Sequence, residues 1–339
     1  MRYTFPVLLA FLFFACQRMP LPTDGSPVTY VGSIERTSPQ LDELIAPGTR
    51  MQQLADGFTW SEGPVWVPAA RMLLFSDVPE NKIYKWTDKG GLVEWLEPSG
   101  YTGTGEYSKE PGSNGLLVDQ NGDLLLAQHG DRRIARLGLK EKILTRSFTT
   151  IADTWEGRKF NSPNDLIQAR DGSIYFTDPP YGLPGQADSE LREIPFQGVY
   201  LIDKNGKISS VIDNLSRPNG VALSPDERTL YVAVSDPKEA VIYAYDRAAD
   251  GTVSTRRVFF DGTDLVKEEK GLPDGMVVDK RGNVYATGPG GVYVFSPEGK
   301  QLGLLRTERA TANVTIGNNG KRLYITADDV LLALPLVNL

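Results

Sequence analysis

A short pattern recurs six times along the chain, and this repetition constrains the fold more than any other feature of the sequence. Each copy opens with a residue that bears a side-chain oxygen, passes through apolar residues to a tight turn, and continues into a second apolar segment. One copy reads NSPNDLIQARDGSIYFTDPP over residues 161–180, with its turn at Asp171 and Gly172. The copies open at Glu62, Asn114, Asn164, Asn219, Asp274 and Asn313, with steps of 52, 50, 55, 55 and 39 residues.

A strand, a tight turn and a second strand, repeated about every 50 residues, are typical of β-propeller blades. Each repeat has room for two further strands, such as residues 82–86, 199–202 and 241–245, and no long segment has a helical period. We predict an all-β fold: a six-bladed β-propeller with four-stranded blades, with five or seven blades as the alternatives. Because ring closure removes exposed sheet edges, residues 51–339 are expected to form one monomeric domain.

The N-terminus has the pattern of an export signal. Arg2 precedes the apolar run 7–15, which is too short to span a bilayer. The only cysteine, Cys16, ends this run, and residues 13–16 resemble a bacterial lipobox, although Phe13 and Phe14 depart from its pattern. We expect a lipoprotein-type signal peptide over residues 1–16, a tether over 17–50, and a protein held in the periplasm or at the cell surface by a lipid on Cys16. Secretion without an anchor is the alternative.

Charge and residue usage exclude several classes of function. The formal net charge is −7, and no cluster of Lys and Arg provides the basic surface that nucleic acids require. With one cysteine, no disulfide supports the fold. His129 is the only histidine, which argues against a multi-histidine zinc centre and leaves one candidate for a Ser-His-Asp triad.

The six opening residues are expected to converge at one mouth of the central channel, because the innermost strand of each blade runs beside it. Carboxylate and amide oxygens are the ligands that calcium takes, whereas zinc prefers nitrogen and sulfur. Two carboxylates nearly neutralise a divalent ion, which lowers the cost of burying its charge. We therefore predict one divalent cation, Ca²⁺ before Zn²⁺, Mg²⁺ or Mn²⁺. The alternative is that the Asn-Gly and Asp-Gly pairs at 114, 219 and 274 are ordinary turns.

From about residue 50 to 335 the chain resembles the regucalcin/gluconolactonase family of six-bladed propellers, and bacterial gluconolactonase-like proteins in particular. The resemblance rests on SEGPVW, GSNGL, AQHGDRRIAR, NSPNDL, TDPPYG, RPNGVALSPD and LPDGMVVD. It implies that the chain opens a sugar-type lactone such as gluconolactone to the aldonic acid. It also implies that one divalent cation, usually calcium, is held by Glu62, Asn164, Asn219 and Asp274. Members with a defined sugar site carry an Arg where this chain has Ser162, which leaves the sugar preference open.

In this reading the cation polarises the lactone carbonyl, and Asp274 is the catalytic base or nucleophile. Weaker candidates for lining the substrate site are Asn114, His129, Tyr181 and Asn313, of which His129 and Tyr181 also fit packing roles. Arg158 and Lys159 are candidates to contact an acidic sugar, and residues 106–110 are expected to be a solvated loop. Two other functions remain: a phosphotriester hydrolase with the same cation, and a non-catalytic surface scaffold with structural calcium.

Overall fold

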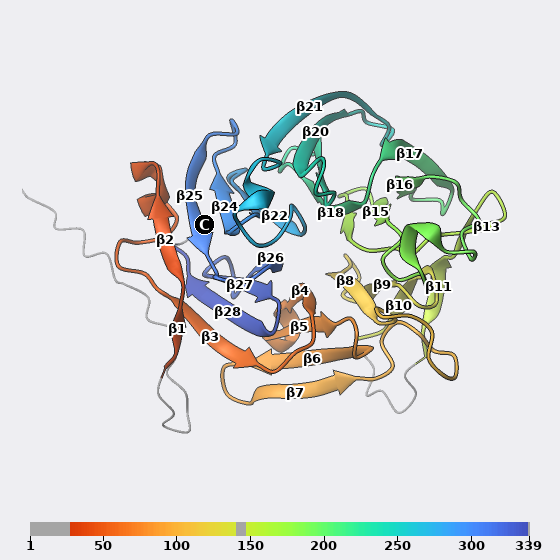
Figure 1. Cartoon of the computed structure of the whole chain (residues 1–339), viewed down its shortest axis with the longest axis horizontal. Coiled ribbons are helices and arrows are strands. Elements are labelled where there is room, and N and C mark those ends of the chain that lie inside the picture. The colour runs from red at the N-terminus through yellow and green to blue at the C-terminus, as the bar shows by residue number, and fades with distance from the viewer. Residues whose placement is uncertain (1–27, 140–146, 338–339) are drawn as a thin grey trace, which may run out of the picture.

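The computed structural model describes residues 28–139 and 147–337. Six antiparallel sheets are arranged as blades around a central axis (Figure 1), which confirms the six-bladed β-propeller with four-stranded blades. The predicted signal peptide and Cys16 lie outside the described residues. No helix within the described ranges has the length and hydropathy needed to span a membrane.

In blades 1 to 5 the four strands follow one another in chain order from the channel outward. Blade 1 is β4 (Ser61–Val67), β5 (Met72–Asp77), β6 (Lys82–Thr87) and β7 (Gly91–Leu96), and blade 2 is β8 (Ser113–Val118), β9 (Leu124–Gln128), β10 (Arg133–Leu137) and β11 (Thr149–Ala152). Blade 3 is β14 (Leu166–Gln168), β15 (Ile174–Asp178), β16 (Gln197–Ile202) and β17 (Ile208–Leu215), and blade 4 is β18 (Pro218–Leu223), β19 (Thr229–Val234), β20 (Val241–Arg247) and β21 (Val253–Asp261). Blade 5 is β22 (Met276–Val278), β23 (Val284–Gly288), β24 (Gly291–Phe295) and β25 (Gln301–Arg306).

Blade 6 closes the ring with strands from both ends of the chain. It contains β26 (Thr311–Gly317), β27 (Arg322–Ala327) and β28 (Val330–Pro335), and its outer strand is β3 (Met51–Asp56). The pairing of β28 with β3 places Val330 opposite Asp56, and the two strands lie side by side in Figure 1. Residues about 270 positions apart in the sequence thus hold the first and last blades together.

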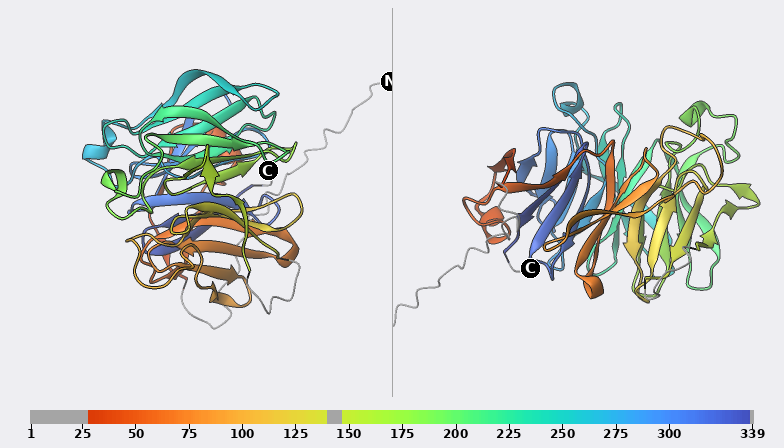
Figure 2. Two further views of the ribbon diagram at one scale, coloured as in Figure 1. Left: turned by 90° about the vertical axis from the view of Figure 1, so that its right-hand side faces the viewer. Right: turned by 90° about the horizontal axis from the view of Figure 1, so that it is seen from below.

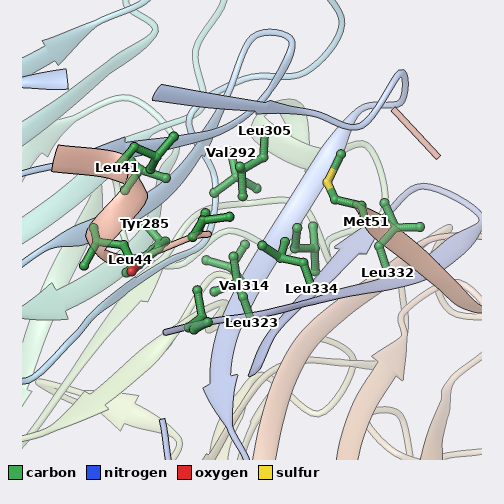
Figure 3. Close-up of a cluster of buried hydrophobic side chains, with 14 of the residues drawn as sticks. Leu41, Leu44, Met51, Tyr285, Val292, Leu305, Val314, Leu323, Leu332 and Leu334 are labelled. Carbon is green, nitrogen blue, oxygen red and sulfur yellow. The ribbon is translucent and has the colours of Figure 1, made fainter. Parts of the chain in front are cut away.

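The segment before β3 packs against the propeller instead of forming a free tether. β1 (Tyr30–Val31) pairs with β3, and β2 (Ser33–Arg36) pairs with β25, so the two short strands extend blades 6 and 5. The 3₁₀ helix η1 (Pro39–Glu43) follows, and Leu41 and Leu44 are buried with Met51 in the cluster shown in Figure 3. Residues 30–45, which fall within the predicted tether over 17–50, therefore pack against the propeller.

The hydrophobic core lies mainly between neighbouring blades. One cluster, for example, joins Leu125 and Ile134 of blade 2 to Phe176 and Tyr200 of blade 3. Seen from the side in Figure 2, the strands run between the two faces of the ring, and the connecting loops project from these faces. The small elements in these loops are β12 (Thr154–Trp155) paired with β13 (Arg158–Lys159), and the 3₁₀ helices η2 (Pro68–Ala70), η3 (Gln186–Asp188) and η4 (Leu265–Lys267).

Candidate functional site

A cavity of about 410 Å³ opens at the end of the channel where the inner strands begin. Five of the six repeat-opening residues line it: Glu62, Asn114, Asn164, Asn219 and Asp274. The sixth, Asn313, donates a hydrogen bond from Nδ2 to Glu62 Oε2 at 3.2 Å. The structure therefore brings together side chains from all six blades.

Local irregularities of the inner strands turn these side chains toward the cavity. The register of strand pairing shifts next to four of the opening residues: Glu62 in β4, Asn114 in β8, Asn219 in β18 and Asn313 in β26. In blades 3 and 5 the regular inner strand begins only after the opening residue, at Leu166 and Met276. A bulge of this kind bends the strand and redirects a side chain, as is common beside functional sites.

Glycines after four of the opening residues allow neighbouring inner strands to approach closely. A Cβ on Gly220 would lie 2.0 Å from the Asp274 carbonyl oxygen, and one on Gly63 would lie 2.0 Å from that of Asn114. A Cβ on Gly275 would lie 1.9 Å from Asn313 Cγ. The Asn-Gly pairs at 114 and 219 lie inside β8 and β18, and the Asp-Gly pair at 274 directly precedes β22 without a turn assignment, so the turn interpretation is wrong.

Asp165 explains why blade 3 opens with two polar residues. Its Oδ1 accepts from the Leu166 backbone N–H at 2.9 Å, and its Oδ2 accepts from that of Val221 in blade 4 at 3.1 Å. Burial raises the pKa of Asp165 to about 6. Asn164 thus faces the cavity while Asp165 links two blades.

Three oxygens of the site have no hydrogen-bond partner among the described residues: Asn114 Oδ1, Asn164 Oδ1 and Asp274 Oδ1. Buried polar atoms are nearly always paired, so each of these oxygens calls for a partner such as an ordered water or an ion. Two of the amide nitrogens have partners outside the cavity: Asn219 Nδ2 donates to Ser235 Oγ at 3.0 Å, and Asn164 Nδ2 lies 3.4 Å from His129 Nε2. Unpaired oxygens on one cavity wall fit a cation.

The electrostatics of the site also favour a bound cation. Burial raises the pKa of Glu62 to about 8, and burial followed by the nearby Glu62 charge raises the pKa of Asp274 well above its usual value. Neither carboxylate has a salt-bridge partner among the described residues, so a positive ion between them would stabilise both charges. Within the described part of the chain no three His, Cys, Asp or Glu residues form a metal-ligating group, so a cation here would depend on amide oxygens.

The remaining candidate residues differ in whether they line the cavity. Tyr181 lines the cavity and its hydroxyl donates to the Ser235 carbonyl oxygen at 3.4 Å, while His129 is fully buried behind Asn164. Arg158 and Lys159 are exposed on β13 and do not line the cavity, so the expected contact with an acidic sugar is not supported.

Sequence reasoning missed several lining residues. Glu110, assigned to a solvated loop, lines the cavity, and burial raises its pKa to about 7. The other missed residues lie in loops or at strand ends, outside the repeat: Trp60, Ser235, Pro237, Val266, Glu269, Gly271, Leu272, Ala310 and Thr311. None has a periodic signal that would have identified it.

Comparison with known proteins agrees with this architecture. Residues 60–329 match the SMP-30/Gluconolactonase/LRE-like region, and the chain belongs to this family. It is 40% identical over 304 residues to a gluconolactonase of Zymomonas mobilis subsp. mobilis, covering 88% of this chain and 84% of the relative. A solved gluconolactonase from Xanthomonas campestris is 33% identical with a TM-score of 0.79, covering 92% of this chain and 98% of that one. A calcium-binding regucalcin from Agrobacterium tumefaciens, 19% identical with a TM-score of 0.65 over 85% of this chain and 94% of that one, shares the fold.

Proposed function

We propose that the protein is a lactonase that opens an uncharged sugar-type lactone, such as gluconolactone, to the corresponding acid. The observation that carries this proposal is one cavity in which Glu62, Asp274 and the unpaired amide oxygens meet, in a chain similar to gluconolactonases over most of its length. The cavity volume of about 410 Å³ is within the range of small-molecule sites.

A divalent cation fits this cavity. Glu62, Asn164, Asn219 and Asp274 would hold it through carboxylate and amide oxygens, the donors that calcium takes, and the absence of nitrogen and sulfur donors from this set favours Ca²⁺ over Zn²⁺. When bound, the cation supplies Lewis-acid polarisation of the lactone carbonyl.

Asp274 is the side chain best placed for proton transfer. Its Oδ1 is free of hydrogen bonds from the described residues and lies on the cavity wall. As general base it would take a proton from water while the water oxygen bonds to the carbonyl carbon, and the ring C–O bond would then break with return of the proton to the leaving alkoxide. As nucleophile its carboxylate would bond to the carbonyl carbon while the ring C–O bond breaks, a water molecule would give a proton to the leaving alkoxide, and the resulting hydroxide would hydrolyse the acyl-enzyme anhydride.

The charges around the cavity favour uncharged substrates. Within the described part of the chain, all the charged side chains that line the cavity are acidic: Glu62, Glu110, Glu269 and Asp274. A cation would offset two of these charges, and Glu269 is paired with Arg306 at 2.8 Å. No basic side chain among the described lining residues is left to bind a phosphate, so we expect gluconolactone to be hydrolysed in preference to its 6-phosphate.

Proton release in a pH-stat with a panel of aldono-, acyl- and phosphorylated lactones tests the proposal, in calcium and in EDTA. We expect calcium-dependent acid production, greatest with uncharged aldonolactones. Asp274→Asn should abolish turnover and retain measurable calcium binding, because an amide oxygen can still ligate. No acid from any lactone while calcium is bound would refute the lactonase, and near wild-type turnover by Asp274→Asn would remove Asp274 from the chemistry.

A further inference from the structure

The only histidine of the chain lies directly behind a proposed cation ligand. His129 follows β9 and is fully buried, and its Nε2 lies 3.4 Å from Asn164 Nδ2. On the other side of the ring, Nδ1 lies 3.8 Å from Glu110 Oε2. A Cβ on Gly182 would lie 2.4 Å from His129 Cβ, so the chain after Tyr181 packs tightly against the histidine and limits its movement.

These contacts determine where the ring hydrogen lies. The amide nitrogen of Asn164 is a donor only, so the histidine nitrogen that faces it must accept. A neutral imidazole has one accepting and one donating nitrogen. With Nε2 accepting, the hydrogen lies on Nδ1, which faces the Glu110 carboxylate at 3.8 Å and has no hydrogen-bond partner among the described residues.

The same contact links the orientation of the Asn164 amide to the tautomer of His129, so the two choices are made together. An asparagine side chain can exchange the positions of its oxygen and nitrogen by rotation, and only its surroundings decide between them. An acceptor at His129 Nε2 selects the orientation with Nδ2 toward the ring. Oδ1 is then directed to the cavity, where it is buried and has no partner among the described residues.

We propose that Glu110 and His129 are positioning residues that hold the amide oxygen of Asn164 toward the cavity as a cation ligand. The Glu110 carboxylate, 3.8 Å from Nδ1, favours a hydrogen on that nitrogen through its charge and without a hydrogen bond, and His129 orients the amide of Asn164. Partners behind the direct ligands commonly orient them in this way in metal sites. The inference rests on the cation of the proposed function and not on the identity of the lactone.

Calcium affinity of the full-length protein, measured by titration calorimetry after removal of bound metal, tests this inference apart from activity. His129→Leu removes the acceptor and should weaken calcium binding by about 10- to 100-fold. His129→Gln retains an acceptor oxygen and should recover part of the loss.

The adjacent residue provides a matched control. Gln128 is also fully buried, and its side chain donates to the Ser99 carbonyl oxygen at 2.8 Å and accepts from Arg133 at 2.6 Å. Gln128→Leu removes a similar number of buried hydrogen bonds away from Asn164. It should lower the melting temperature and leave calcium affinity unchanged.

The tautomer can be read directly, because a protein labelled with ¹⁵N-histidine has one pair of ring nitrogens in its spectrum. We expect the hydrogen on Nδ1 in the wild type and a loss of this preference in Glu110→Leu. A hydrogen on Nε2, wild-type calcium affinity in His129→Leu, or equal losses in His129→Leu and Gln128→Leu would each overturn the inference while the cation site stands. A wild-type protein that binds no divalent cation would instead remove the cation from the proposed function, and this inference with it.

Discussion

Replacement of Gly220 by alanine tests whether the close approach of the inner strands sets the geometry of the site. The new Cβ would lie 2.0 Å from the Asp274 carbonyl oxygen, whereas Cβ atoms are essentially never closer than 3.0 Å to another heavy atom. The backbone at Asp274 or Gly220 must therefore move by at least 1.0 Å. Because the obstructing atom belongs to the main chain, no side-chain rotation relieves the contact.

Both stability and activity should respond. Overpacking of this kind typically costs about 1–3 kcal/mol. For a fold of this size each kcal/mol corresponds to about 1.5 °C, so we expect the melting temperature to fall by about 2–4 °C. A displacement near 1 Å at a catalytic group can lower the rate by about 100-fold. Lactone hydrolysis at 25 °C, where the variant remains folded, should therefore fall far more than the loss of stability explains.

Gly138→Ala is the matched control. The nearest heavy atom to a Cβ at Gly138 is Asp123 Oδ1 at 4.0 Å, and Gly138 is not among the glycines with positive φ. The same chemical change should then be neutral or stabilise by about 0.4–1 kcal/mol through the unfolded state. If Gly220→Ala has the activity and melting temperature of Gly138→Ala, the inner strands do not fix the site as we argue.

Three further predictions concern stability. Asp178 is fully buried and accepts from the Asn161 and Ser162 backbone N–H groups, both at 2.8 Å, and burial raises its pKa to about 7. The folded state keeps the Asp178 proton to a higher pH than the unfolded chain, so the stabilising contribution of this proton is lost as the pH rises toward 7. The melting temperature of Asp178→Asn should therefore depend less on pH between about 4 and 8 than that of the wild type. Equal pH dependence in the two proteins would contradict this. Gly32 has φ of 67° and a Cβ there would lie 1.8 Å from the Arg306 carbonyl oxygen, so Gly32→Ala should detach β1 and β2, expose this segment to limited proteolysis and leave activity at 25 °C unchanged; an uncleaved variant would count against it. Removal of the cation with EDTA should lower the melting temperature, by an amount equivalent to about 2.7 kcal/mol when calcium had been present at 100 times its dissociation constant, and calcium-independent melting would argue against the site.

The blades and the ring of side-chain oxygens could be predicted because both follow from the position of a residue within the repeat. A residue at the same position in every repeat occupies the same place in every blade, so Glu62, Asn164 and Asp274 could be placed at one mouth although they lie far apart in the chain. The glycines that follow them were harder to interpret, since Asn-Gly and Asp-Gly also form turns. Only the structure shows that they serve close approach between blades.

What could not be predicted lies outside the repeat. Glu110 is a charged residue in an irregular loop, and composition alone places such a residue in solvent. Its position depends on how the loop folds back over blade 2, where the Gly130 N–H donates to the Pro111 carbonyl oxygen. The N-terminal strands have two and four residues. Strands of that length have too few positions for an alternating pattern, so residues 30–36 could not be distinguished from the tether.

The closure of the ring by β3 and β28 also sets the order of events during synthesis. Glu62 is made early, but its hydrogen-bond donor Asn313 belongs to the last blade. β3 pairs with β1 along one edge, and its other edge has no partner until β28 follows. Until then the chain exposes an unpaired strand edge, which is prone to association with other chains. A product that stops before Val330 leaves both β27 and β3 with an unpaired edge, so the loss of ten residues exposes strands from the first and last parts of the domain. The pocket is therefore among the last parts of the fold to form, because it is complete only when the ring of blades is closed.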